Sequence, residues 1–218
     1  MAQRVISIGD IHGCADALKS LLGAIVPRAE DVIVTLGDYV DRGPDTCGVL
    51  TQLIDLKAKC ELISLTGNHE IMMLDAVDVE EPEMREFWLG CGGAETVASY
   101  GASVDAISQD HIQFLRQCRR HYETSTHFFV HANYDPDLTL DKQPDHLLFW
   151  DHLSEVSQPH RSGKIAIVGH TPQLSGEILD RKHLKCIDTY CFGTGWLTAL
   201  DVTTGTSWQA DQHGQLRS

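Results

Sequence analysis

Five short segments of the sequence carry side chains that commonly bind metal ions. The segments are GDIHG (9–13), GDYVDRGP (37–44), GNHE (67–70), FFVHAN (128–133) and VGHTP (168–172), and their candidate ligands are Asp10, His12, Asp38, Asn68, His131 and His170. Carboxylate and amide oxygens mixed with imidazole nitrogens suit first-row divalent ions, whereas structural zinc sites usually contain cysteine. We therefore predict a centre of two divalent ions, with manganese expected first and iron, zinc or nickel as alternatives.

Each motif also has an ordinary structural explanation when it is considered alone. A Gly-Asp pair after a strand usually forms a turn, and Asn68 suits the cap of a following helix. A backbone carbonyl is the usual partner of a single histidine such as His131 or His170. A metal-capable residue at the ends of five successive strands is difficult to attribute to five separate accidents, so the combination favours a metal centre.

Apolar, β-branched runs lead into these motifs and predict buried strands. The runs cover residues 4–10, 31–38, 61–68, 127–133 and 164–170. Helical periodicity covers residues 15–26 and 46–59, between the first three strands. Alternating strands and helices favour right-handed crossovers onto a largely parallel sheet, and the carboxyl ends of its strands face one ligand-binding crevice.

The rest of the chain shows two further patterns. Residues 70–125 have helical periodicity in pieces without an obvious strand, which predicts a helical insertion, positioned as a lid over one edge of the sheet. Residues 183–188, 196–202 and 206–210 resemble short strands separated by glycine turns, which predicts an antiparallel finish. The sequence contains no repeat, low-complexity tract or linker, so we predict a single domain over residues 1–218.

Composition limits the classes of partner and compartment. The 218 residues have a formal net charge of -14, which disfavours nucleic acid and anionic membranes as partners. Bound cations would reverse that field locally for a phosphorylated substrate. The seven cysteines include no CxxC pair and nothing at the start resembles an export signal, so we expect reduced thiols and a cytoplasmic protein. No apolar run approaches the length of a membrane span, and no oligomeric state is predicted.

The five motifs, in this order, resemble those of the calcineurin-like metallophosphoesterases, and the DRG sequence is similar to the phosphoprotein phosphatase branch with its small bacterial and phage members. The resemblance implies an α/β sandwich of two mixed β-sheets flanked by helices. It also implies that Asp10, His12 and Asp38 bind one ion, while Asp38, Asn68, His131 and His170 bind the second. Asp38 would then bridge the two ions.

The same resemblance implies roles for the remaining motif residues. His69 would be the general acid, oriented by Asp41, and Arg42 would hold the phosphate together with Asn68 and His69. The chemistry agrees, because a neighbouring carboxylate orients an imidazole and favours its charged form, and a guanidinium matches two phosphate oxygens. A surface salt bridge to Asp41 or Asp45 is the alternative role for Arg42.

The chain departs from the family where a second phosphate-binding arginine generally follows a tryptophan. Here LLFWDHLSE (147–155) offers Asp151 and His152, so His152, His160 and Arg161 are the candidate substitutes. Tyr190 is a candidate substrate contact, with simple packing as the alternative. LGCGGAETVASYG (89–101) resembles a glycine pair that precedes a helix beside the cleft in the small bacterial members, and a plain helix entry explains it equally well.

The resemblance implies a dinuclear metal-dependent phosphomonoesterase that acts by in-line attack of a metal-bridging hydroxide. The expected activity is that of a protein phosphatase on phosphoserine and phosphothreonine, with phosphotyrosine and small phosphomonoesters as further substrates. One alternative is a hydrolase of dinucleoside polyphosphates such as diadenosine tetraphosphate, which Asp41 disfavours. Another is a non-catalytic module that binds phosphorylated partners, which His69 disfavours because a pure binder needs no proton donor.

Overall fold

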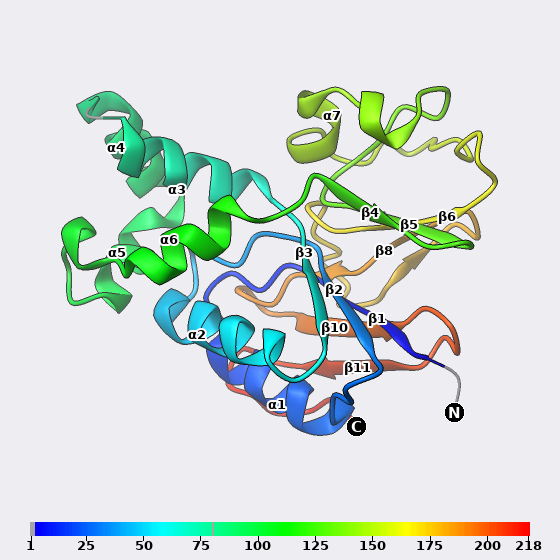
Figure 1. Ribbon diagram of the computed structural model, residues 1–218, viewed down its shortest axis with the longest axis horizontal. Coiled ribbons are helices and arrows are strands. Elements are labelled where there is room, and N and C mark those ends of the chain that lie inside the picture. The colour runs from blue at the N-terminus through cyan, green and yellow to red at the C-terminus, as the bar shows by residue number, and fades with distance from the viewer. Residues whose placement is uncertain (1–2, 80) are drawn as a thin grey trace.

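Two β-sheets form the centre of the computed structural model, which describes residues 3–79 and 81–218 (Figure 1). The first sheet has the order β11-β10-β1-β2-β3, with β9 also paired to β10. Its strands are β1 (Val5–Ile8), β2 (Val32–Thr35), β3 (Glu61–Ser64), β9 (Asp188–Thr189), β10 (Trp196–Asp201) and β11 (Ser207–Ala210). β1, β2 and β3 run parallel, while β10 is antiparallel to β1, β9 and β11.

The second sheet has the order β4-β5-β6-β8-β7. Its strands are β4 (His121–Glu123), β5 (His127–Val130), β6 (Ile165–Val168), β7 (Leu179–Asp180) and β8 (Leu184–Cys186). β5, β6 and β8 are parallel, and β4 and β7 pair antiparallel at the two edges. The two mixed sheets confirm the expected fold class.

Alternating side chains along the central strands divide the core into layers. Ile33 of β2 faces the helices α1 (Ala15–Ile25) and α2 (Thr46–Lys57), whereas Val32 and Val34 pack against Phe129 and Ile167 of the other sheet. Phe128 and Val130 face outward toward α7 (Asp145–Phe149). This two-residue period places one apolar layer between the sheets and one outside each of them.

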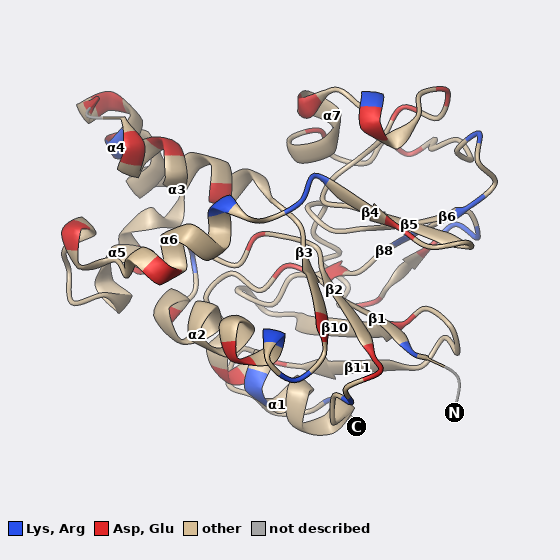
Figure 2. Ribbon diagram, in the orientation of Figure 1, with Lys and Arg blue, Asp and Glu red and all other residues tan. Residues whose placement is uncertain are grey.

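A group of helices lies between β3 and β4 in the chain. They are α3 (Asn68–Asp78), α4 (Pro82–Trp88), α5 (Ala94–Ser99) and α6 (Gln109–Arg116), with short helical turns at Leu89–Gly93 and Val104–Ala106. Figure 1 shows them gathered beyond α2, on the opposite side of the fold from α7 and a third short turn, Leu140–Lys142. Acidic residues occur on each of α3 to α6 (Figure 2).

The structure differs from the sequence-based expectations in two details. β4 falls inside residues 70–125, where no strand was expected, and it pairs with β5 through the register His121↔Val130. β8 belongs to the segment expected to finish antiparallel, yet it pairs parallel with β6. β8 is also antiparallel to β7, so the expectation is wrong for its pairing with β6 alone, while β9, β10 and β11 pair antiparallel as expected. Strand direction depends on the partner to which the chain returns.

The described residues contain no helix with the length and apolar character needed to cross a membrane. All seven cysteines are free, and four of them are buried. The single-domain prediction is not tested by these observations and stays a prediction.

A buried glutamate joins α3 to the loop that follows β2. Glu70 is fully buried, and its carboxyl oxygens accept N–H groups from Gly67 at 2.8 Å, Asp38 at 2.7 Å, Tyr39 at 2.7 Å and Val40 at 3.3 Å. Four backbone donors would otherwise lose their partners inside the protein. Glu70 therefore fixes the backbone of two site-bearing loops relative to each other.

We expect Glu70→Gln to lower the free energy of unfolding by about 1–3 kcal/mol, because a side-chain amide has one acceptor oxygen and leaves buried N–H groups unpaired. Urea denaturation of the metal-free protein measures this change. Glu95→Gln is the matched control, since Glu95 is also in the first turn of a helix but is exposed. Equal stability of the two variants would show that the four contacts of Glu70 contribute little.

Candidate metal centre

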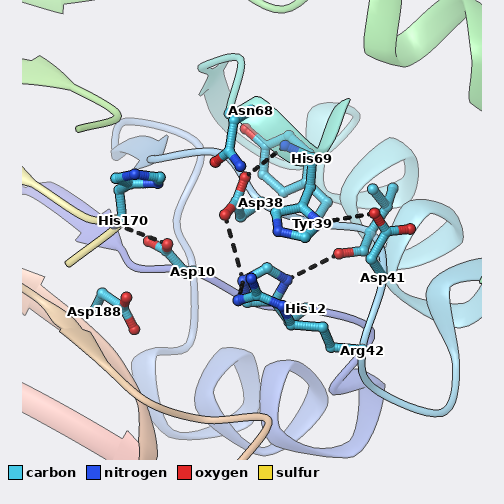
Figure 3. Close-up of polar contacts among 12 residues, drawn as sticks. Asp10, His12, Asp38, Tyr39, Asp41, Arg42, Asn68, His69, His170 and Asp188 are labelled. Carbon is cyan, nitrogen blue, oxygen red and sulfur yellow. Dashed lines mark hydrogen bonds and ion pairs between the residues drawn. The ribbon is translucent and has the colours of Figure 1, made fainter. Parts of the chain in front are cut away.

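The six candidate metal ligands come together at the carboxyl ends of β1, β2, β3, β5 and β6. Asp10, His12, Asp38, Asn68 and His131 are buried, and His170 is half-buried. Figure 3 shows Asp10, His12, Asp38, Asn68 and His170 around one space. A cavity of about 250 Å³ lies there, lined by Asp10, His12, Asp38, Arg42, Asn68, His69, Trp150, His152, His170, Pro172 and Asp188.

Each of the three candidate histidine ligands has one ring nitrogen on a backbone carbonyl. His12 Nδ1 lies 3.0 Å from Val40 O, His131 Nδ1 lies 2.9 Å from Leu36 O, and His170 Nε2 lies 2.9 Å from Trp150 O. A carbonyl only accepts, so that nitrogen carries the proton and the other presents a lone pair. Metal-binding histidines are commonly oriented in this way.

The nitrogens that carry lone pairs converge on shared points. His131 Nε2 lies 3.2 Å from His170 Nδ1 and 3.1 Å from Asn68 Oδ1. Burial lowers the pKa of His170 to about 4 and that of His12 to about 3, so both rings are neutral at pH 7. Neutral imidazoles with acceptors facing one another are arranged to receive a cation.

Asp38 lies between two groups of imidazoles. Its Oδ2 is 3.4 Å from His12 Nε2, and its Oδ1 is 3.4 Å from His131 Nε2. Burial raises the pKa of Asp38, but neighbouring histidines, among them His69 with its own raised pKa, lower it by more, so the net shift is downward and the carboxylate form is favoured. Asp38 is therefore placed to contribute one oxygen to each of two ions.

Two groups of residues bring their potential ligand atoms close together. The first is His12, Asp38 and His69, and the second is Asp38, His131 and His170; within each group the atoms lie within 4.8 Å of one another. The first set contains His69, the expected proton donor, and not Asp10. Asp10 Oδ2 accepts the His170 N–H at 2.9 Å, while Asp10 Oδ1 is buried without a hydrogen-bond partner. Burial and the negative charge of Asp188 raise the pKa of Asp10 well above its ordinary value. An unpartnered buried carboxylate oxygen is suited to bind a cation.

His69 and Asp41 form the expected pair. His69 Nδ1 lies 2.7 Å from Asp41 Oδ2, and both side chains are buried. Burial lowers the pKa of His69, but Asp38 and Asp41 raise it by more, so the net shift is upward. Trp88 Nε1 at 3.0 Å and Thr96 Oγ1 at 2.8 Å also donate to Asp41 Oδ1, which opposes the rise that burial causes in the Asp41 pKa.

Arg42 is exposed at the edge of the cavity. Its Nη1 lies 3.1 Å from His12 Nε2, and its guanidinium carbon is 4.6 Å from the centre of the Phe192 ring. Among the described residues, no ion pair joins Arg42 to Asp41 or Asp45, the alternative weighed from sequence. Asp45 instead caps α2 by accepting the Gly48 N–H at 2.8 Å.

The glycine pair at Gly92 and Gly93 packs against two residues of the site. Gly92 contacts Arg42, and Gly93 contacts Trp88, which donates to Asp41. Gly92 O accepts the Arg42 N–H at 3.0 Å, and Gly92 has a φ of 114°. A Cβ on Gly92 would lie 2.7 Å from the Arg42 side chain, and one on Gly93 would lie 2.5 Å from the Trp88 ring. The pair is therefore more than a plain helix entry.

The candidates for a second phosphate contact lie in different places. His152 lines the cavity and stacks on His170 with ring centres 4.7 Å apart. His160 is buried against Leu138 O, and Arg161 donates to Asp137 O, so neither lines the cavity. Tyr190 packs edge-on against Phe192, one layer behind Arg42.

Several site residues were missed from sequence. Trp88 and Thr96 gave no signal, because they contact Asp41 across 47 and 55 residues of chain. Phe192 lies outside the five motifs, and Trp150 and Pro172 lie in segments quoted above but were given no role there because both are apolar. Asp188 follows the short strand β8 as Asp10 follows β1, so the same rule of polar residues at strand ends would have found it.

Comparison with known proteins agrees with this geometry. The profile of the calcineurin-like phosphoesterase family matches residues 3–195. A serine/threonine-protein phosphatase 1 from Salmonella typhimurium is 31% identical over 89% of this chain and 90% of its own length. A symmetrical bis(5'-nucleosyl)-tetraphosphatase from Cellvibrio japonicus is 30% identical over 62% of this chain and 47% of its own length.

Among solved structures, a putative diadenosine tetraphosphatase superposes with a TM-score of 0.73 at 23% identity, covering 96% of this chain and 94% of that one. This likeness supports the fold alone. The family match spans most of the chain and includes all five motifs. The protein therefore belongs to the calcineurin-like phosphoesterases.

Proposed function

We propose that the protein is a dinuclear metal-dependent phosphomonoesterase that acts as a protein phosphatase. The observation that carries the proposal is the position of Asp38, whose two oxygens face His12 and His131, two imidazoles that backbone carbonyls hold in place. The family to which the chain belongs uses a dinuclear metal centre. The buried pair of His69 and Asp41 supplies a proton donor beside that centre.

The donor set fits two divalent ions. Asp10, His12 and Asp38 would hold one of them, and Asp38, Asn68, His131 and His170 would hold the other. Manganese is our first expectation, followed by iron, zinc or nickel, because all of these accept mixed oxygen and nitrogen ligands. When bound, such ions neutralise phosphoryl charge and activate a water molecule as the nucleophile.

His69 would donate a proton from Nε2 to the leaving oxygen of the substrate. Its Nδ1 is held by Asp41, so Nε2 is the nitrogen that faces the cavity. The upward shift of its pKa favours the protonated ring that a general acid requires. Trp88 and Thr96 hold Asp41 in place from behind.

Arg42 would hold the phosphate through its guanidinium fork, and Asn68 would assist it. The Phe192 ring under the guanidinium limits its orientation. His152 is our candidate for the second phosphate contact, because of the three sequence candidates it alone lines the cavity. Arg161 and Tyr190 are not supported as direct contacts by their positions.

The size of the cavity favours a phosphoryl group carried by a larger molecule outside. At about 250 Å³ it is smaller than the 300–1,000 Å³ typical of pockets that enclose a whole small molecule. A phosphoserine or phosphothreonine side chain of a protein or peptide fits this arrangement, as does a small phosphomonoester. The serine/threonine-protein phosphatase relative, matched over nearly its whole length, also supports this substrate class. The seven free cysteines support a cytoplasmic location, where thiols stay reduced.

Asp38→Asn should abolish manganese-stimulated hydrolysis of an aryl phosphate such as p-nitrophenyl phosphate, because the neutral amide cannot serve two cations. Asp45→Asn is the matched control, since Asp45 belongs to the same loop but only caps α2, a role that asparagine also fills. Initial rates over a range of Mn²⁺ concentrations provide the measurement. Activity of Asp38→Asn equal to that of the control would contradict the proposed function.

His69→Asn should reduce kcat about a hundredfold or more while metal content stays near that of the unmodified protein, because the change removes a proton donor. Metal analysis alongside steady-state kinetics tests this separation. His111→Asn controls for the loss of a buried histidine, since His111 contacts Tyr100 away from the cavity. Parallel loss of metal and activity would instead make His69 a ligand of the first ion, as its close approach to His12 and Asp38 allows.

A substrate comparison separates the protein phosphatase from its nearest alternative. Local similarity to the tetraphosphatase relative supports a hydrolase of dinucleoside polyphosphates as that alternative. We expect kcat/KM to be higher on phosphoserine and phosphothreonine peptides than on diadenosine tetraphosphate, with a phosphotyrosine peptide in the same panel. The reverse order would assign the alternative, and tight phosphopeptide binding without turnover would indicate a non-catalytic module.

A further inference from the structure

Asp188 is a buried carboxylate of the cavity that none of the roles above uses. It is 3% exposed and lines the cavity together with Asp10 and His12. Its backbone is fixed by the pairing of β9 with β10 at Leu197 and by the Gln173 N–H, which donates to Asp188 O at 2.9 Å. The side chain is therefore held at the cavity wall by the fold.

Only one oxygen of Asp188 has a hydrogen-bond partner in the described part of the chain. Oδ1 accepts the Tyr190 N–H at 3.1 Å, and no donor reaches Oδ2. Figure 3 shows the carboxyl group turned toward the space that Asp10 and His12 also face. Asp10 Oδ1 is fully buried without a partner, whereas Asp188 Oδ2 is not fully buried. Two unpartnered carboxylate oxygens thus share one wall of the cavity.

The two carboxylates repel each other. Each is only 3% exposed, and both line the same cavity. Like charges in a site of low dielectric are unfavourable unless a cation lies between them. Arg42 is the one lysine or arginine among the residues that line the cavity, and its side chain is exposed.

A turn-stabilising role does not account for this arrangement. Asp201, at the other end of β10, supports its turn with both oxygens: Oδ1 accepts the Thr203 N–H at 2.9 Å, and Oδ2 accepts the Thr204 hydroxyl at 2.9 Å. Asp188 makes the same Oδ1 contact with the residue two positions ahead but leaves Oδ2 to the cavity. The difference lies in Oδ2, which accepts a hydroxyl in Asp201 and has no hydrogen-bond donor in Asp188 within the described part of the chain.

We propose that Asp188 is an additional carboxylate of the cation site at Asp10 and His12 and binds the same divalent ion through Oδ2. The proposal rests on the dinuclear centre of the proposed function and adds a ligand to it. It gives the first ion a third carboxylate besides Asp10 and Asp38, which hard divalent cations favour. It also gives both unpartnered oxygens a common partner.

Metal binding without turnover tests the proposal. Mn²⁺ is titrated into the metal-free protein by calorimetry, and bound metal is counted after dialysis, for the unmodified chain, Asp188→Asn and Asp201→Asn. We expect Asp188→Asn to bind one of two ions about 10–100-fold more weakly and the other unchanged. Asp201→Asn should bind both ions like the unmodified chain. Without metal, Asp188→Asn should unfold at the same temperature or higher, because a repulsion is removed.

The outcomes distinguish this inference from the proposed function. Two ions bound with unchanged affinity by Asp188→Asn would overturn the role of Asp188 and leave the metal centre standing. Fewer than two ions bound by the unmodified chain would overturn the centre and this inference together. Asp188→Ser provides a second variant, since its hydroxyl can accept the Tyr190 N–H; if Asp188→Asn misfolds, unchanged affinity in Asp188→Ser is the overturning result.

Discussion

The position of the Asp38 carboxylate is the constraint on which the rest of the site depends. Its two oxygens face His12 and His131, which come from different sheets. Its backbone is also fixed by hydrogen bonds. Asp38 O accepts the N–H groups of Ile11 and His12, and the Asp38 N–H donates to the Glu70 carboxylate. One residue therefore joins the loops after β1 and β2 to the first turn of α3, and a shift of any of them would move the Asp38 carboxylate.

Backbone strain is concentrated at this junction. Nine described residues other than glycine have positive φ. Five of them belong to the site, namely His12, Asp38, Asp41, Arg42 and His170, and a sixth, Tyr190, packs behind Arg42. Such conformations cost about 1–3 kcal/mol each and persist only where surrounding contacts determine them. Glu70 and the Gly92 carbonyl provide such contacts. The helices α3 to α5 thus do more than cover the sheet, since they hold strained loops in place.

Much of the fold could be predicted because its information is local. Period-two and period-3.6 patterns identified the strands that carry the motifs and the helices α1 and α2. The parallel pairing of β8 with β6 and the presence of β4 could not be predicted in this way. Both depend on which distant segment supplies hydrogen-bond partners, and an alternating pattern of side chains does not specify that partner or its direction.

The sequence by itself determined the chemical types of the site and their places at strand ends, because Asp10, Asp38 and His131 follow apolar runs in the chain. Only the tertiary structure decided how they are used. It fixed which imidazole nitrogen faces the cavity, through carbonyls up to 95 residues away. It also brought Trp88 to Asp41 and Asp188 beside Asp10, since contacts between distant segments arise from packing and leave no local periodicity to detect.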